Sequence, residues 1–196
     1  MRAVFRYNKA LLKISGRVRP DAGDITQHED CGKDRGRYIV IRKANVTDVK
    51  QIAKLIKYYA ARNKMLPRSL NELYENIRDF FVYTEGKAVY GCCALHIDWE
   101  DLGEIKSLAV ARSKLRKSIG RRLLESCLKE ARALKLSRVF ALTYAPEFFK
   151  KRGFAPFDKQ NLPHKIWNEC IRCVHFPDCG ETAMLKELKK DVRVQS

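Results

Sequence analysis

The sequence lacks the features that mark membrane, secreted or repetitive proteins. Among its 196 residues, no apolar run approaches the roughly 20 that a helix needs to cross a bilayer. No clean apolar stretch follows the basic N-terminus, as a secretory signal would require, and no internal repeat or low-complexity tract is present. Hydrophobic residues make up 45% of the chain, enough for a packed core. We therefore expect one cytoplasmic domain of ordinary size with no membrane partner.

Acidic residues are also scarce relative to basic ones. The chain has 40 Lys and Arg against 23 Asp and Glu, which gives a net charge of +17. Such a charge attracts anions, among them nucleic acid and phosphate-bearing cofactors. The basic residues are dispersed along the chain and are not interleaved with aromatic residues in a repeated pattern. We therefore favour a basic surface over a nucleic-acid interface and expect a small-molecule partner, with a homodimer left open.

The first 37 residues differ from the rest of the chain. No acid precedes Asp21, and Gly, Asp and His are frequent from there to Arg37. We interpret residues 1–37 as a loosely ordered basic extension, residues 38–190 as the folded domain and residues 191–196 as a tail. An Arg-rich start without acids also resembles an organellar presequence, although this one is poor in Ser. An organellar location is therefore the alternative to the cytoplasm.

Cysteines occur seven times, but only one Cys-x-x-Cys pair is present. Cys92, Cys93 and Cys127 lie in apolar patterns and are predicted to be reduced core residues. A second group has spacing that zinc ligands can adopt: Cys170, Cys173, His175 and Cys179. Structural zinc sites usually show two such pairs, so we favour reduced cysteines and no metal, with zinc as the alternative.

Hydrophobic periodicity divides the domain into strands and helices. Asn45 or Thr47 can cap the first helix, and Ser69 with Glu72 forms a capping box for the second. The pattern predicts strands at residues 38–42, 80–83, 88–99, 104–110, 139–142 and 182–188. It predicts helices at residues 49–59, from Ser69 onward, at 119–134 and from Pro146 to Gly153. Strands that alternate with helices, together with one hairpin, indicate a mixed sheet covered by helices.

The most informative unit is a strand, a basic loop and a helix that begins at Ile119. The N-terminus of a helix presents unpaired backbone N–H groups and the positive end of the helix dipole, which suits a pyrophosphate. Cations at that end are unfavourable unless an anion lies among them. Six basic residues crowd this helix start: Arg112, Lys114, Arg116, Lys117, Arg121 and Arg122. We therefore predict an anion site here, against the alternative of a solvated basic face.

Two motifs resemble one known superfamily. Glu-Ile-Lys-Ser-Leu-Ala-Val at residues 104–110, followed by the basic loop and Ile119-Gly120, resembles the acetyl-CoA motif of GNAT N-acetyltransferases. Phe-Phe-Lys-Lys-Arg-Gly-Phe at residues 148–154 resembles the later helix-and-glycine segment of the same superfamily. The resemblance covers about residues 38–188. It implies an α/β (α+β) GNAT fold, with a mixed, mostly antiparallel central sheet flanked by helices, and acetyl-CoA as cosubstrate.

Further segments narrow the resemblance within the superfamily. Residues 66–69 (Leu-Pro-Arg-Ser), 92–96 (Cys-Cys-Ala-Leu-His), 141–144 (Ala-Leu-Thr-Tyr) and 161–165 (Asn-Leu-Pro-His-Lys) look like short N-acetylglutamate synthases without a kinase domain. This resemblance implies acetylation of the α-amine of L-glutamate, the first step of arginine biosynthesis. An arginine suits bidentate carboxylate binding, so Arg68 is the main candidate to bind glutamate, with Lys106 and Lys165 as weaker candidates.

The resemblance also assigns roles around acetyl-CoA. The implied cofactor-binding residues are Leu108, Ala109, Val110, Arg116, Lys117, Ser118, Ile119, Gly120 and Arg121. Glu104 is the candidate base, acting through water, and strand alternation predicts that it shares a face with Lys106, Leu108 and Val110. The alternative for Glu104 is a structural ion pair with Lys106. Tyr144 is the candidate acid, because Phe149 stands where many GNAT enzymes place a tyrosine.

The pyrophosphate loop departs from the usual pattern. Leu115 and Ser118 occupy positions that usually hold a polar residue and a glycine, and of the pattern only Gly120 is kept. Leu115 supplies no polar contact, and Ser118 tolerates a left-handed backbone less well than glycine. Two alternatives therefore stay open beside glutamate acetylation. One is a GNAT enzyme for a protein or other amine, and the other is a non-catalytic module that binds polyanions.

Overall fold

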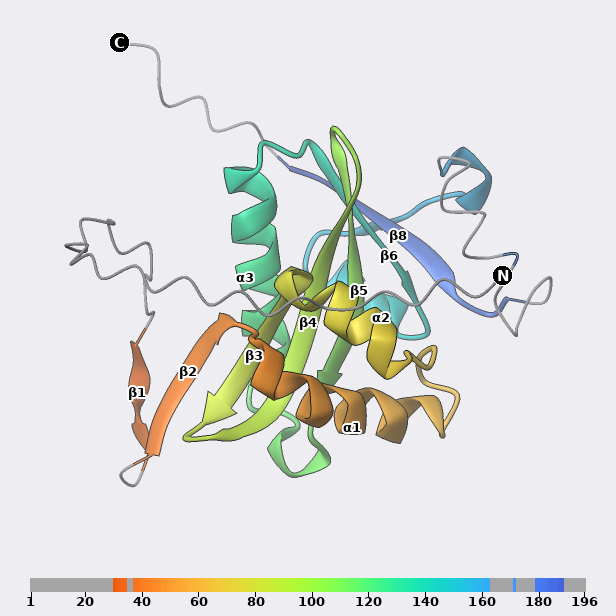
Figure 1. Ribbon diagram of the computed structural model, residues 1–196. Coiled ribbons are helices and arrows are strands. Elements are labelled where there is room, and N and C mark those ends of the chain that lie inside the picture. The colour runs from red at the N-terminus through yellow and green to blue at the C-terminus, as the bar shows by residue number, and fades with distance from the viewer. Residues whose placement is uncertain (1–29, 35–36, 163–170, 172–178, 189–196) are drawn as a thin grey trace, which may run out of the picture.

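The computed structural model describes residues 30–34, 37–162, 171 and 179–188. Within these residues the chain forms one eight-stranded sheet with the strand order β1-β2-β3-β4-β5-β6-β8-β7 (Figure 1). The strands are β1 (Asp30–Asp34), β2 (Arg37–Lys43), β3 (Phe80–Glu85), β4 (Ala88–Trp99), β5 (Leu102–Val110), β6 (Arg138–Thr143), β7 (Ala155–Pro156) and β8 (Thr182–Glu187). The helices are α1 (Val49–Ala60), α2 (Leu70–Glu75), α3 (Ile119–Ala133) and α4 (Pro146–Lys150), with short 3-10 turns η1 (Val46–Asp48), η2 (Ile77–Asp79), η3 (Arg112–Lys114) and η4 (Lys159–Asn161).

The sheet is mixed and mostly antiparallel, as the resemblance implied. Every neighbouring pair in the described sheet is antiparallel except β5 with β6, which run parallel. A parallel pair needs a crossover, and α3 provides it. The parallel ladder is short, since it joins residues 102–104 of β5 to residues 138–140 of β6. Beyond Glu104 the two strands therefore diverge.

Helices cover both faces of this sheet (Figure 1). On one face, α1 and α2 bury Val49, Ile52, Ile56 and Leu73 against strands β3, β4 and β5. On the other face, α3 buries its apolar stripe in a larger cluster that also contains Phe149 and Phe154. The stripe consists of Ile119, Leu123, Leu124, Cys127, Leu128 and Ala131. The two faces thus have separate cores. The apolar faces that the sequence predicted for the helices pack against these cores.

The helix starts follow the predicted capping residues. Asn45 caps η1, which leads directly into α1, and its side chain accepts a hydrogen bond from the Thr47 backbone N–H at 3.0 Å. Ser69 and Glu72 form the predicted capping box at the start of α2. The last predicted helix ends earlier than expected, at Lys150, and a turn follows in which Gly153 has φ +79°. A left-handed backbone at that turn favours glycine, which explains the end of the segment.

Two strands were not predicted. Strand β1 lies inside the segment expected to be a loose extension, and it pairs with β2 through Asp34 opposite Arg37. Strand β7 is two residues long and pairs with β8. The rest of residues 1–36 and the predicted tail at residues 191–196 lie outside the described residues. In the described part of the chain, no helix combines the length and apolar character of a membrane span.

The three cysteines predicted to lie in the core are buried there. Cys92, Cys93 and Cys127 are each 0% exposed and are free thiols. Burial raises the pKa of the Cys92 thiol to about 12, because the thiolate would lose its hydration. These thiols therefore act as small apolar side chains between the sheet and α3 or α1.

Gly91 sets how closely α3 approaches β4. A Cβ atom at this position would lie 2.9 Å from Leu123 Cδ1 and 3.2 Å from Ile119 Cγ2. Both neighbours are buried, so neither can move far. We predict that Gly91→Ala lowers the free energy of unfolding by about 1–3 kcal/mol, the usual cost of overpacking.

Urea unfolding followed by circular dichroism measures this change. Gly180→Ala is the matched control, since its Cβ would meet the Tyr144 ring at an ordinary 3.6 Å. The control should stay within about 0.5 kcal/mol of the parent. Equal stability of Gly91→Ala and the parent would contradict the close approach of α3.

Candidate active site

A cavity of about 810 Å³ opens where β5 leaves β6. Its wall comes from the end of α1, the segment before α2, strands β4 and β5, the start of α3 and the end of β6. The structure brings eight of the predicted site residues to this wall: Arg68, Glu104, Lys106, Leu108, Ala109, Val110, Gly120 and Tyr144. Arg116, Lys117, Ser118, Ile119 and Arg121 lie in the adjoining loop and helix start. Lys165 lies outside the described residues.

A bulge at Ser107 changes which way the β5 side chains face. Ala94 pairs with Lys106 and Cys92 pairs with Ala109, so Cys93 alone opposes two residues of β5. Ser107 has φ 54°, and its carbonyl accepts a hydrogen bond from the Cys92 thiol at 3.4 Å. An extra residue in one strand reverses the alternation of the side chains beyond it.

The expectation that Glu104, Lys106, Leu108 and Val110 share one face was therefore wrong. Glu104 and Lys106 lie opposite His96 and Ala94 in the ladder, and Ala94 belongs to the core under α1 and α2. Leu108 and Val110 pack instead against the α3 core. Strand alternation alone cannot anticipate this, because a bulge is a property of the pairing between two strands. The bulge thus separates the side of the cavity next to α1 and α2 from the side next to α3.

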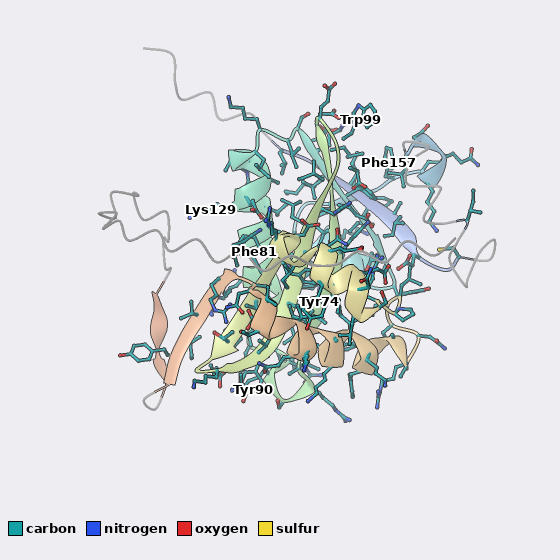
Figure 2. All side chains as sticks on the ribbon, in the orientation of Figure 1. Tyr74, Phe81, Tyr90, Trp99, Lys129 and Phe157 are labelled. Atoms are coloured by element: carbon teal, nitrogen blue, oxygen red, sulfur yellow. The ribbon has the colours of Figure 1, made fainter. Side chains whose placement is uncertain are left out.

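The basic loop leads from β5 to α3 at the end of β4 that carries Tyr90 (Figure 2). Arg116 and Ser118 have φ values of 62° and 56° and thus adopt the left-handed conformation. Ser118 is the N-cap residue of α3, and its side chain makes no capping hydrogen bond. The first N–H groups of α3 therefore rely on a partner other than this cap, which fits an anion such as a pyrophosphate.

Not all of the basic residues near this loop are placed for a phosphate. Lys114 makes a 2.6 Å ion pair with Glu85 and lies over the Tyr90 ring, 4.9 Å from its centroid. The hydrogen bond from Lys114 holds the pKa of the Glu85 carboxyl below its usual range. Arg122 lies over the Tyr83 ring, 5.7 Å from its centroid. Lys114 thus anchors the loop to the end of β3, whereas Arg112, Arg116 and Lys117 are exposed cations of the loop.

The side of the cavity next to α1 and α2 carries two acid–base pairs that lie next to each other on the sheet. Glu104 Oε2 lies 3.0 Å from Lys106 Nζ, and these side chains are 9% and 12% exposed. His96 Nδ1 lies 2.6 Å from Asp79 Oδ2. The Glu104–Lys106 pair matches the structural alternative considered for Glu104, and it also places that carboxylate in the cavity wall. The pair is therefore compatible with either role.

His96 and Asp79 were not predicted as site residues. The hydrogen bond to Asp79 raises the pKa of His96, while partial burial and the nearby Lys106 charge oppose this shift. In the sequence, His96 appeared only inside the Cys-Cys-Ala-Leu-His segment. Asp79 carried no signal, because only the fold of η2 onto β4 brings it to His96. A histidine held by a carboxylate in a cavity is a frequent acid–base arrangement.

Arg68 and Tyr144 line the cavity from other elements. Arg68 lies one residue before the α2 cap, and its Nη1 is 3.5 Å from Glu72 Oε1. Tyr144 follows the last residue of β6. Phe149 is 5% exposed and packs edge-on against Phe148 and Phe154, so it belongs to the α3 core. Of these residues, Tyr144 is the one that can offer a hydroxyl to the cavity.

The candidate zinc site is represented by one residue. Cys179 is a half-buried free thiol whose Sγ lies 3.6 Å from Lys159 Nζ. Its proposed companions Cys170, Cys173 and His175 lie outside the described residues. Among the described residues, no three potential ligands lie close enough to hold a metal ion.

Comparison of the sequence identifies the family. The acetyltransferase (GNAT) family model matches residues 46–154. An uncharacterized N-acetyltransferase of Chlorobaculum tepidum is 38% identical over 148 residues, which are 76% of this chain and 96% of that protein. An amino-acid acetyltransferase of Mycobacterium tuberculosis is 37% identical over 137 residues, 68% of this chain and 78% of that protein.

Solved structures share the fold. The N-acetylglutamate synthase of Neisseria gonorrhoeae, complexed with coenzyme A and N-acetyl-glutamate, has a TM-score of 0.72 and 29% identity over 78% of this chain. This chain spans only 35% of that synthase. A Mycobacterium tuberculosis protein, solved with CoA and a ligand designated NLQ, has a TM-score of 0.67 and 32% identity, covering 76% of this chain and 99% of that one. The chain belongs to the GNAT family and is an N-acetyltransferase that takes its acetyl group from acetyl-CoA.

Proposed function

We propose that this protein acetylates the α-amine of L-glutamate and so catalyses the first step of arginine biosynthesis. The similar proteins named amino-acid acetyltransferases support a free amino acid as acceptor. The observation that carries the proposal further is that Arg68 lines the same cavity as Glu104 and its ion-pair partner Lys106. A small dicarboxylate needs cationic partners near the point where its amine reacts.

The proposed reaction begins with a proton. An amino-acid amine arrives mostly protonated at neutral pH and must lose a proton before it can attack the thioester. Glu104 is the proposed base, through one or more waters, because its carboxylate lies in the cavity wall three residues before the bulge. The Lys106 ammonium lies 3.0 Å from that carboxylate and attracts the negative charge that a base requires.

The β5 backbone would hold the acetyl donor. Past Glu104 this strand no longer pairs with β6 in the described ladder, so the segment Leu108–Val110 borders the cavity instead. An N–H group of this segment, aimed at the thioester carbonyl, would stabilise the charge that develops on its oxygen. Tyr144, which also lines the cavity, is the proposed donor of a proton to the departing thiolate. The N-terminus of α3, with Arg116 and Lys117, would bind the pyrophosphate.

The first prediction of this proposal concerns the cofactor. Arg116→Ala combined with Lys117→Ala should weaken acetyl-CoA binding by tenfold or more, since each charge-assisted hydrogen bond is worth about 1.5–3 kcal/mol. Isothermal calorimetry at rising salt measures both the loss and its ionic origin. Lys54→Ala with Lys57→Ala is the control, because these exposed lysines lie on α1. If the parent protein bound no CoA but did bind a polyanion, the alternative of a non-catalytic module would replace this proposal.

The second prediction concerns the base. Glu104→Gln should lower kcat by about 10²–10⁴-fold, the usual contribution of general base catalysis, with little change in CoA affinity. Glutamine keeps the size of the side chain and a hydrogen-bonding oxygen near Lys106, so the wall should remain folded. Steady-state kinetics and calorimetry together make this comparison. An unchanged kcat across neutral pH would leave Glu104 with a structural role only.

The third prediction concerns the acceptor. Arg68→Lys should lower kcat/KM for glutamate by roughly ten- to a hundredfold although the charge is kept, because lysine cannot hold a carboxylate with two parallel donors. CoA affinity should not change. Glutamine, which keeps the α-carboxylate but has no charged side chain, should be a poorer acceptor than glutamate.

A screen of free amino acids and a peptide amine tests the same assignment. Arg62→Lys is the control for the substitution, since Arg62 stacks on Tyr58 at the surface. Refusal of glutamate, glutamine and aspartate, with acetylation of a peptide amine, would show that the acceptor is another amine.

A further inference from the structure

The Asp79–His96 pair has no role in the reaction proposed above, although His96 faces the proposed base. His96 of β4 and Glu104 of β5 are direct partners in the antiparallel ladder. Partners of this kind have Cβ atoms about 4.5–5.5 Å apart and project from the same face of the sheet. Both side chains line the cavity. The two groups are therefore placed to exchange a proton directly or through one water.

Asp79 fixes which nitrogen of His96 can take part. The carboxylate lies 2.6 Å from Nδ1, so the neutral ring donates its Nδ1–H to Asp79 and carries its lone pair on Nε2. Asp79 is the last residue of η2 and stands directly before β3, which pairs with β4. The orienting carboxylate is thus attached to the sheet itself. A partner on one ring nitrogen fixes the tautomer and the orientation of the ring, so that the other nitrogen is the one that accepts a proton.

Glu104 is a poor final place for the proton. Protonation would remove the negative charge that lies 3.0 Å from the Lys106 ammonium, in a position where both side chains are about nine-tenths buried. Removal of one charge of a buried pair is strongly unfavourable. His96 differs in two ways, because its positive form would be stabilised by Asp79 and its side chain is 28% exposed. A proton that reaches His96 can therefore continue to solvent.

We propose that His96, held by Asp79, relays the proton from Glu104 to solvent during acetyl transfer. An N–H bond of the acceptor ammonium breaks, and its proton moves through water to the Glu104 carboxylate. The resulting carboxylic acid passes a proton to His96 Nε2, which restores the Glu104–Lys106 ion pair and forms an imidazolium bound to Asp79. The imidazolium then releases one proton to water and returns to its neutral form. No other reactant is required.

The relay makes the rate depend on the charge state of His96. Three charged side chains act on the His96 ring: Asp79 from η2, Asp98 from β4 itself and Lys106 from β5. Glu104 of β5 faces His96 as its partner in the ladder. The Asp79 hydrogen bond raises the His96 pKa, while partial burial and the Lys106 charge oppose this shift. Below its pKa the ring already carries the proton that it should accept. The rate should therefore fall as the pH falls through the His96 pKa.

The decisive experiment compares pH–rate profiles of three variants with the parent enzyme. His96→Gln should lower kcat by about 10²-fold, remove the acidic limb of the profile and leave KM for the acceptor and CoA affinity unchanged. Asp79→Asn should move that limb to lower pH, because loss of the carboxylate lowers the His96 pKa. Asp101→Asn is the matched control, since Asp101 pairs with Arg138 outside the cavity wall and should leave the profile unchanged.

Nuclear magnetic resonance supplies a readout independent of turnover. The chain has four histidines, so the signal that disappears in His96→Gln is assigned directly. Its pKa should fall in Asp79→Asn and also in Glu104→Gln, because each substitution removes a negative charge beside the ring. If His96 had only a structural role, its pKa would still fall in Asp79→Asn, but the acidic limb of the pH–rate profile would not move.

This inference rests on the proposed acetylation of an amino acid but not on glutamate in particular. The assay therefore uses whichever amine the parent enzyme acetylates fastest. Failure of glutamate as acceptor, with the pH effects intact, would overturn the glutamate assignment and keep the relay. If His96→Gln had the same kcat and the same pH–rate profile as the parent enzyme, the relay would be overturned and the acceptor assignment would be unaffected.

Discussion

The divergence of β5 from β6 is the constraint on which the rest of this structure depends. Parallel strands in a sheet are normally joined along their length, yet here the ladder is limited to residues 102–104 and 138–140. The bulge at Ser107 follows at once, so the backbone of β5 turns away from its neighbour with its side chains reversed. One irregularity therefore creates the cavity and also separates its two sides. Glu104 and Lys106 lie on the face of the sheet that α1 and α2 cover, and Leu108 and Val110 lie on the face that α3 covers.

The sequence predicted the parts of the fold that local interactions determine. The Ser69–Glu72 capping box, the apolar stripe of α3 and the buried cysteines of β4 all depend on residues close together in the chain, and the structure contains each of them. The bulge could not be predicted in this way, because it exists only in the pairing of β4 with β5. Asp79 was missed for the same reason, since 17 residues separate it from His96 and only the sheet brings them together.

The candidate site was predicted less completely than the fold. The family resemblance placed Glu104, Arg68 and Tyr144, which line one cavity, but it gave no information about their partners. The charge pattern at the start of α3 grouped Lys114 with the cations of an anion site, whereas Glu85 holds that lysine against the sheet. Ser118 was expected to resist a left-handed backbone, and it adopts one with φ 56°. A left-handed residue other than glycine typically costs about 1–2 kcal/mol, so the surrounding loop contacts must over-determine this turn.

Two ion pairs hold basic side chains of the cavity wall and of the adjoining loop in place. Lys106 is bound to Glu104 and Lys114 to Glu85, in each case with both side chains largely buried, so neither cation is easily drawn to a new anion. Arg68 differs, because its contact with Glu72 is longer, at 3.5 Å, and the Glu72 side chain is 46% exposed. Exposed pairs contribute little, and Glu72 already accepts the Ser69 backbone N–H at 2.7 Å. Arg68 is therefore a cation of the cavity wall that can exchange its partner for the carboxylate of the proposed substrate at low cost, while the Glu104–Lys106 and Glu85–Lys114 pairs keep their geometry.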